Sequence, residues 1–107
     1  MTFPNSGVCR ILVALFLSLL AAGALSAQTS RLDKVLASGE MRVCIWPDYY
    51  GISYRNRKTQ ALQGIDIDMA RALARDLGVG VRFIDSSFAK LIDDVNQDRC
   101  DLAMFAI

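Results

Sequence analysis

Apolar residues follow two different periods in the middle of the chain. Between residues 64 and 77 they recur every three or four positions, which places Met69, Leu73 and Leu77 on one stripe of an amphipathic helix. Between residues 79 and 84 they alternate with other residues, as they do in a strand that buries one face. The pattern therefore predicts a helix over 64–77 and then a strand over 79–84.

Similar signals predict the other elements after residue 28. They are a helix over 30–38, a strand over 41–46, a small hairpin between Tyr54 and Leu62, a helix capped by Ser86 or Ser87 that runs to about Asp98, and a strand over 102–107. Strands that alternate with amphipathic helices favour right-handed crossovers and parallel pairing. The predicted fold class is therefore α/β, a partial parallel sheet with flanking helices. Because the chain stops inside an apolar run, we expect it to be the N-terminal part of a longer protein or the product of a truncated gene.

The first 27 residues have a different pattern from the rest. Arg10 precedes an unbroken apolar run over residues 11–22, and small residues follow it. This order predicts a cleavable secretory signal over residues 1–27, cut after Ala27 or, as a second choice, after Ser26. The alternative is a membrane anchor, but a span needs about 20 apolar residues and this run is shorter. We expect a soluble, periplasmic product that begins at residue 28.

Charge and composition exclude several kinds of site. The chain has 12 basic and 11 acidic residues, and loss of Arg10 with the signal leaves a net charge of zero. Neither a basic patch for nucleic acid nor an acidic tail is present in the sequence. Because the chain has no histidine, a histidine-based triad and a histidine-ligated metal are excluded. We therefore expect no nucleic-acid partner, no metal and no cofactor.

Two of the three cysteines are expected to remain after export. Cys9 lies in the signal, which leaves Cys44 and Cys100 in an oxidising compartment, where an even number of cysteines favours a disulfide. Their separation fits no metal-binding or redox motif with two closely spaced cysteines. The alternative is a pair of buried thiols that never meet.

Candidate ligand-binding residues follow the first two strands of the predicted sheet. Ligands of open parallel sheets bind beyond the carboxyl ends of the strands. The loops there hold Asp48, Tyr49, Tyr50, Ser53 and Tyr54 after the first strand, and Asp85, Ser86, Ser87 and Phe88 after the second. Aromatic rings, hydroxyls and backbone N–H groups at a helix start suit a small-molecule cleft. We predict that Asp48, Tyr49, Tyr54, Ser87 and Phe88 bind the ligand.

Each of these residues also has a structural interpretation. Phe88 fits the apolar stripe of the following helix, and the tyrosines can pack on the predicted hairpin. The two serines can act as helix caps, which is compatible with an anion site. Asp66 and Asp68 lie at a helix start, where the helix dipole favours negative charge, and we do not assign them to catalysis.

Five short segments, taken together, resemble a known family. They are GEMRV at 39–43, PDY at 47–49, GIDIDMA at 64–70 with LGV at 77–79, Phe88 with Leu91 and Ile92, and CDLA at 100–103. In this order and spacing the chain is similar to the periplasmic solute-binding proteins of amino-acid ABC transporters, family 3. The resemblance spans residues 32–107.

The resemblance implies a fold and a function. Members have two α/β lobes that close on a ligand, in the type II fold of periplasmic binding proteins, and residues 28–107 would be the N-terminal part of the first lobe. The loop after the first strand and Phe88 would line the cleft, and Ile52 stands where many members carry a clamping phenylalanine. The implied function is the binding of an amino acid or a similar small polar solute by a monomer that serves an ABC permease in the inner membrane. The alternatives are a periplasmic cyclohexadienyl dehydratase on the same fold, or a sensor or accessory module.

The family's sheet order also bears on the two cysteines. In the family the first strand of the chain lies between the second and the third. The strand that carries Cys44 and the strand that follows Cys100 would therefore be neighbours. Neighbouring strands lie about 4.8 Å apart, within the range of about 4.4–6.8 Å that a disulfide requires between Cα atoms. The register stays open, because Cys44 lies inside its strand and Cys100 precedes its own, and a one-residue slip reverses a side chain.

Overall fold

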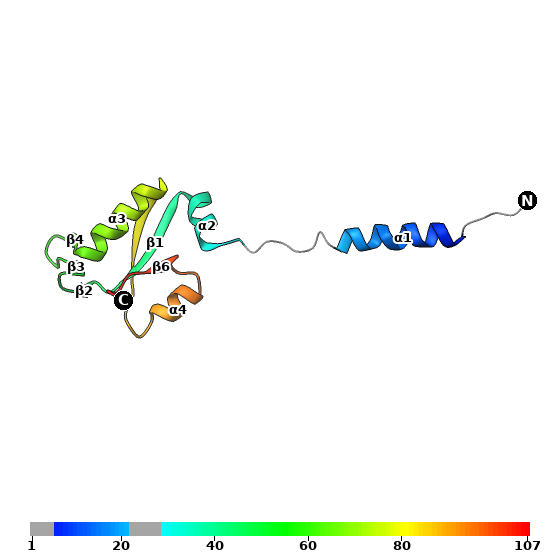
Figure 1. The fold of residues 1–107 in the computed structure, drawn as a ribbon. Helices are drawn as coiled ribbons and strands as arrows, with labels where there is room; N and C mark the ends of the chain where they lie inside the picture. The colour runs from blue at the N-terminus through cyan, green and yellow to red at the C-terminus, as the bar shows by residue number, and fades with distance from the viewer. Residues whose placement is uncertain (1–5, 22–28) are drawn as a thin grey trace, which may run out of the picture.

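Three parallel strands form the main sheet of the computed structural model, which describes residues 6–21 and 29–107. β1 (Glu40–Ile45) lies between β5 (Gly80–Asp85) and β6 (Leu102–Ala103), as Figure 1 shows. Val43 pairs with Phe83 of β5 on one side and with Leu102 of β6 on the other. This arrangement confirms the predicted parallel sheet, in the order second, first, third.

Helices cover both faces of this sheet (Figure 1). Met41, Val43 and Ile45 of β1 pack in one buried cluster with residues of α2 (Arg31–Ser38) and α3 (Ile65–Leu77). On the opposite face, a second cluster contains Cys44 and side chains of α4 (Leu91–Asn96). Apolar side chains therefore leave β1 in both directions, as they do in a strand that is buried on both faces.

A smaller antiparallel sheet lies beyond the carboxyl end of β1. Its strands are β2 (Asp48–Tyr49), β3 (Ser53–Arg55) and β4 (Leu62–Gln63), paired in that order. The pairing of β3 with β4 confirms the predicted hairpin. α3 begins against the turn between β2 and β3, where a Cβ on Gly64 would lie 2.3 Å from the Ile52 carbonyl oxygen. Only glycine fits this close approach, and its φ of 134° is also one that other residues rarely adopt.

The fourth helix starts later than the sequence pattern predicts. α4 begins at Leu91, and neither Ser86 nor Ser87 caps it through its side chain. The backbone N–H of Ser86 instead donates to the carbonyl oxygen of Ile45 at 2.8 Å, which prolongs the contact between β1 and β5. This sheet contact holds Ser86 out of the helix. Ile92 of α4 is 67% exposed, although it is apolar.

The last strand is shorter than predicted. β6 covers Leu102–Ala103, whereas the apolar run continues to Ile107. Phe105 is buried, but Ala106 has a φ of 58° and its N–H donates to the carboxylate of Asp66 at 3.0 Å. The chain therefore turns toward α3 and leaves the sheet.

The N-terminal apolar run forms α1 (Ser6–Ala21). The predicted cleavage sites after Ser26 and Ala27 lie outside the described residues. Within residues 6–21 and 29–107, none of the helices is both long enough and apolar enough to cross a membrane.

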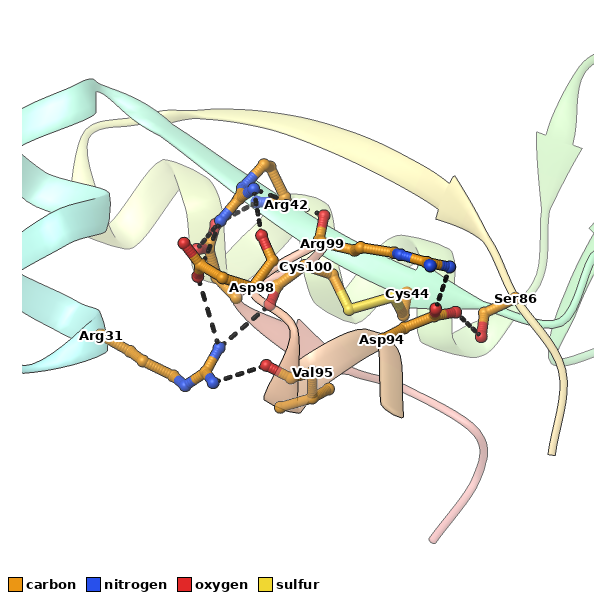
Figure 2. The surroundings of a disulfide bond; sticks show 10 residues. Arg31, Arg42, Cys44, Ser86, Asp94, Val95, Asp98, Arg99 and Cys100 are labelled. Atoms are coloured by element: carbon orange, nitrogen blue, oxygen red, sulfur yellow. Dashed lines mark hydrogen bonds and ion pairs between the residues drawn. A yellow bond between two sulfur atoms is a disulfide. The ribbon is translucent and has the colours of Figure 1, made fainter. Parts of the chain in front are cut away.

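A disulfide joins Cys44 of β1 to Cys100 (Figure 2). Both cysteines are fully buried, and their Cα atoms lie 5.7 Å apart. The chain bends at Asp101, so Cys100 is not an extension of β6 but lies on the face of β1 that carries Cys44. In the structure this bend settles the question of register that the sequence leaves open.

Two arginines form hydrogen bonds with the segment between α4 and β6 and hold it in place (Figure 2). Arg31 donates to the carbonyl oxygens of Val95 at 2.6 Å and Cys100 at 3.0 Å. Arg42 donates to the carbonyl oxygen of Asp98 and to the carboxylate of Asp101, both at 2.8 Å. Burial acts to raise the pKa of Asp101, but hydrogen bonds from the side chain and backbone N–H of Arg42 outweigh it and lower this pKa.

We expect neither Cys44 nor Cys100 to react as a thiol in protein purified without reductant and then denatured. Reduction should lower stability, and the chain-entropy model gives about 4 kcal/mol for a loop of this size, since the cysteines are 56 residues apart. Thiol titration and urea unfolding measure both effects. Detection of the two thiols in addition to any from Cys9 would contradict the disulfide.

Replacement of Asp101 by Asn should lower the free energy of unfolding at pH 7 by about 1.5–3 kcal/mol, because hydrogen bonds to a charged group are lost. The folded-state pKa of Asp101 is lowered, so its stabilisation is present above the unfolded value near 3.8 and is lost as pH falls through the folded value. The difference between wild type and variant should therefore shrink below about pH 4. Urea unfolding at several pH values measures this, with Asp93→Asn on the exposed side of α4 as the control. A difference that does not change with pH would contradict the assignment.

Candidate functional site

Four aromatic rings gather at the carboxyl edge of the parallel sheet. Trp46 follows β1, Tyr49 lies in β2, Phe88 follows β5 and Phe105 follows β6. The Trp46 ring centroid lies 5.5 Å from those of both Tyr49 and Phe88, and the Phe88 centroid lies 5.1 Å from that of Phe105. These tilted and edge-to-face contacts are favourable for aromatic pairs. We call these four residues the aromatic cluster.

The aromatic cluster has a buried base and an exposed rim. Phe105 is 1% exposed and packs against the Cys44–Cys100 disulfide, whereas Phe88 is 48% exposed. The structure therefore places Phe88 at the edge of the core, in contact with Phe105 below it. An aromatic ring held in this way offers its free side to a small molecule.

Backbone contacts with the small sheet fix the loop that carries Trp46 and Tyr49. The buried hydroxyl of Ser53 donates to the Trp46 carbonyl oxygen at 2.8 Å, and the Arg55 N–H donates to the Pro47 carbonyl oxygen at 2.8 Å. Pro47 ends β1 because it has no N–H for a strand ladder. The chain consequently turns into β2 with Tyr49 beside Trp46.

The other predicted site residues lie away from the aromatic cluster or at its border. Tyr54 makes a separate ring pair with the largely exposed Tyr50, at 5.4 Å between centroids. Asp48 forms an exposed ion pair with Arg57 at 3.4 Å. Ser87 precedes Phe88, and its carbonyl oxygen accepts the N–H groups of Lys90 and Leu91. Of the five predicted ligand-binding residues, the structure brings Tyr49 and Phe88 together, and a ligand contact remains a prediction for all five.

An ion pair links the small sheet to the end of β5. Arg55 of β3 donates to the carboxylate of Asp85 at 2.6 Å, and Asp85 is the neighbour of Ile45 in the main sheet. The Nε of Arg55 is buried and has no hydrogen-bond partner among the described residues. The carboxyl edge therefore also carries a guanidinium beside a carboxylate.

Sequence reasoning did not assign Trp46, Phe105 or Arg55 to the site. The sequence pattern puts Trp46 at the end of the first predicted strand and Phe105 inside the last predicted strand. The position of Trp46 at the carboxyl end of the predicted strand is a signal that could have identified it. Phe105 and Arg55 carry no such signal, because their positions depend on how the chain leaves β6 and on the pairing of β3.

The side chains at this edge are of kinds that bind small molecules non-covalently. Aromatic faces, hydroxyl groups and a guanidinium–carboxylate pair can hold a small molecule that has both apolar and polar parts. Within the described residues, no three or more cysteine, aspartate or glutamate side chains lie together in a way that could hold a metal ion.

Comparison with known proteins agrees with the fold. Residues 41–107 match the model of the bacterial extracellular solute-binding proteins, family 3. The chain is 43% identical over 91 residues to a cyclohexadienyl dehydratase from Pseudomonas aeruginosa, in a match that covers 85% of this chain and 34% of that protein.

Two solved structures of ancestral proteins are similar as well. An ancestral cyclohexadienyl dehydratase gives a TM-score of 0.69 at 37% identity, over 76% of this chain and 33% of that one. An ancestral cationic amino acid solute-binding protein gives 0.69 at 32% identity, over 73% and 34%. The chain thus spans about a third of the length of these relatives.

The family match covers more than half of the chain and includes β5, β6 and all of β1 except its first residue. It contains four of the five sequence segments that suggested the family and most of the fifth, at residues 39–43. The two ancestral structures share the fold of parallel sheet and flanking helices. On this evidence the chain belongs to the bacterial extracellular solute-binding proteins of family 3.

Proposed function

We propose that this chain forms part of the first lobe of a periplasmic protein that binds an amino acid or a similar small polar solute for ABC import. Residues 1–27 serve as a cleavable signal, and residues 28–107 belong to the lobe. The bound solute is delivered to a permease in the inner membrane, and the binding protein acts as a monomer. Family membership and the similarity to a cationic amino acid solute-binding protein support this function.

The half-exposed ring of Phe88 is the observation that carries the proposal. A large apolar side chain at the surface is accounted for when a ligand covers it, and it lies here at the edge where open parallel sheets bind ligands. Contacts with Trp46, Tyr49 and Phe105 restrict the ring before any ligand arrives. Such preorganisation lowers the entropy lost on binding.

A dehydratase is the second candidate function. It is favoured by the 43% identity to a cyclohexadienyl dehydratase. Loss of water from a hydroxylated cyclohexadiene breaks the C–O bond, as an acid protonates the leaving hydroxyl, and a ring C–H bond, whose proton goes to a base; its electron pair completes the aromatic ring. An acid and a base on opposite sides of the ligand would be needed, and with only about a third of the relatives' length this chain supplies one side of the cleft.

Calorimetry on the full-length exported protein, with both sides of the cleft present, distinguishes these functions. We expect one of a panel of amino acids that includes L-arginine to bind with a dissociation constant in the micromolar range, about 8 kcal/mol of binding free energy. Incubation with a hydroxylated cyclohexadiene carboxylic acid should then produce no aromatic absorbance. Catalytic formation of an aromatic product would favour the dehydratase, and failure of both assays would contradict both functions.

Replacement of Tyr49 or Phe88 by Ala should raise the dissociation constant by about five-fold for each residue, since an aromatic contact contributes about 1 kcal/mol beyond its buried area. Phe88→Ala should have only a small effect on thermal stability, because half of the ring is already exposed. Tyr50→Ala is the matched control, because Tyr50 is 80% exposed and lies outside the aromatic cluster. Unchanged affinity together with lost stability would instead assign these rings to the core.

A further inference from the structure

A buried carboxylate lies between the disulfide and the loop that carries Phe88. Asp94 of α4 is 3% exposed. One of its oxygens accepts the Ser86 hydroxyl at 2.6 Å, and the other accepts the Arg99 guanidinium at 2.8 Å. Figure 2 shows this chain of contacts running from Arg99 through Asp94 to Ser86, beside the Cys44–Cys100 bond.

The two partners of Asp94 belong to different parts of the fold. Arg99 directly precedes Cys100, which the disulfide holds against β1. Ser86 opens the loop after β5, two residues before Phe88, and its N–H is bonded to the carbonyl oxygen of Ile45. Asp94 therefore links a covalently fixed segment to the loop that carries the exposed ring of the aromatic cluster.

Stability alone does not account for a carboxylate at this position. Moving a charge out of water is costly unless hydrogen bonds replace the lost hydration, and well-packed apolar residues often stabilise a core at least as well. Asp94 lies on the helix whose Leu91 and Val95 side chains pack against the buried disulfide and Phe105. An apolar residue at position 94 would bury its side chain but would leave the Ser86 hydroxyl without this acceptor. The distinct property of Asp94 is the short, charge-assisted hydrogen bond that fixes Ser86.

We propose that Asp94 is a positioning residue for the ligand cleft: through Ser86 it holds the Ser86–Phe88 loop so that the Phe88 ring stays against Trp46 and Tyr49. The proposal rests on the proposed function in one respect, namely that the aromatic cluster lines the cleft. Its immediate consequence, the position of Phe88 in the protein without ligand, does not depend on which solute binds.

Trp46 provides a direct readout of this position. It is the only tryptophan of the 107 residues, and its ring contacts Phe88 at 5.5 Å between centroids. We expect Ser86→Ala and Asp94→Ala to shift the Trp46 emission to longer wavelength and to increase its quenching by acrylamide, in both cases toward the values of Phe88→Ala. Ser86→Thr, which keeps the hydroxyl, should restore the wild-type values. In this Trp46 readout the double variant should differ little from either single one, because the Ser86–Asp94 contact is already lost in each of them.

Asp93→Asn is the matched control, since Asp93 is the exposed neighbour of Asp94 on the same helix. All spectra are recorded below the thermal transition of each variant, so that loss of stability does not imitate a local change. Variants that melt earlier but keep wild-type Trp46 emission and quenching would overturn the proposal and leave Asp94 a purely structural residue. If Asp94→Ala does not fold, Ser86→Ala decides the question. Because no ligand is added, a failure of solute binding would count against the proposed function and not against this positioning role.

Discussion

Burial of β1 on both faces is the constraint on which the rest of the structure depends. Met41, Val43 and Ile45 leave the strand toward α2 and α3, while Cys44 leaves it toward α4. A strand in this position requires partners on both edges and a layer of helix on each face. The chain meets this requirement with β5 and β6 beside β1, and the disulfide adds a covalent link on the α4 face.

The candidate site follows from the same constraint. Parallel strands all end at one edge of a sheet, so the segments after β1, β5 and β6 converge there. Each contributes one ring to the aromatic cluster, namely Trp46, Phe88 and Phe105, and Tyr49 adds a fourth from the small sheet. The cluster thus connects the core around the disulfide to the surface that a ligand would reach.

Three buried aspartates hold the segments that converge on this sheet. Asp66 accepts the N–H of Ala106 after β6, Asp94 accepts the hydroxyl of Ser86 after β5, and Asp101 accepts both the backbone and the side chain of Arg42. A buried carboxylate needs hydrogen-bond donors in place of water, so each one specifies the position of the group that donates to it. Asp66 lies at the start of α3, as the sequence predicts. Its hydrogen bond with Ala106 gives it a second role, in holding the segment after β6.

Local sequence patterns were sufficient to identify most of the fold. The spacing of apolar residues in 64–77 and 79–84 located α3 and β5 to within one residue, because burial of one face imposes the period of the element. The small residues after the apolar run are enough to predict export, and five short segments are enough to indicate the family as a resemblance. Tyr49 and Phe88 are predicted as site residues because they follow strands, and the structure brings their rings together.

Only the tertiary structure decided the features that depend on contacts between distant residues. The late start of α4 results from the bond between Ser86 and Ile45, and the short β6 accompanies the turn that the Asp66–Ala106 bond holds. The bend at Asp101 brings Cys100 to Cys44, which no count of residues along a strand could establish. Arg55 and Phe105 acquire their partners in the same way. Periodicity reports which side of an element is buried, whereas these partners are set by the packing of elements that lie far apart in the chain.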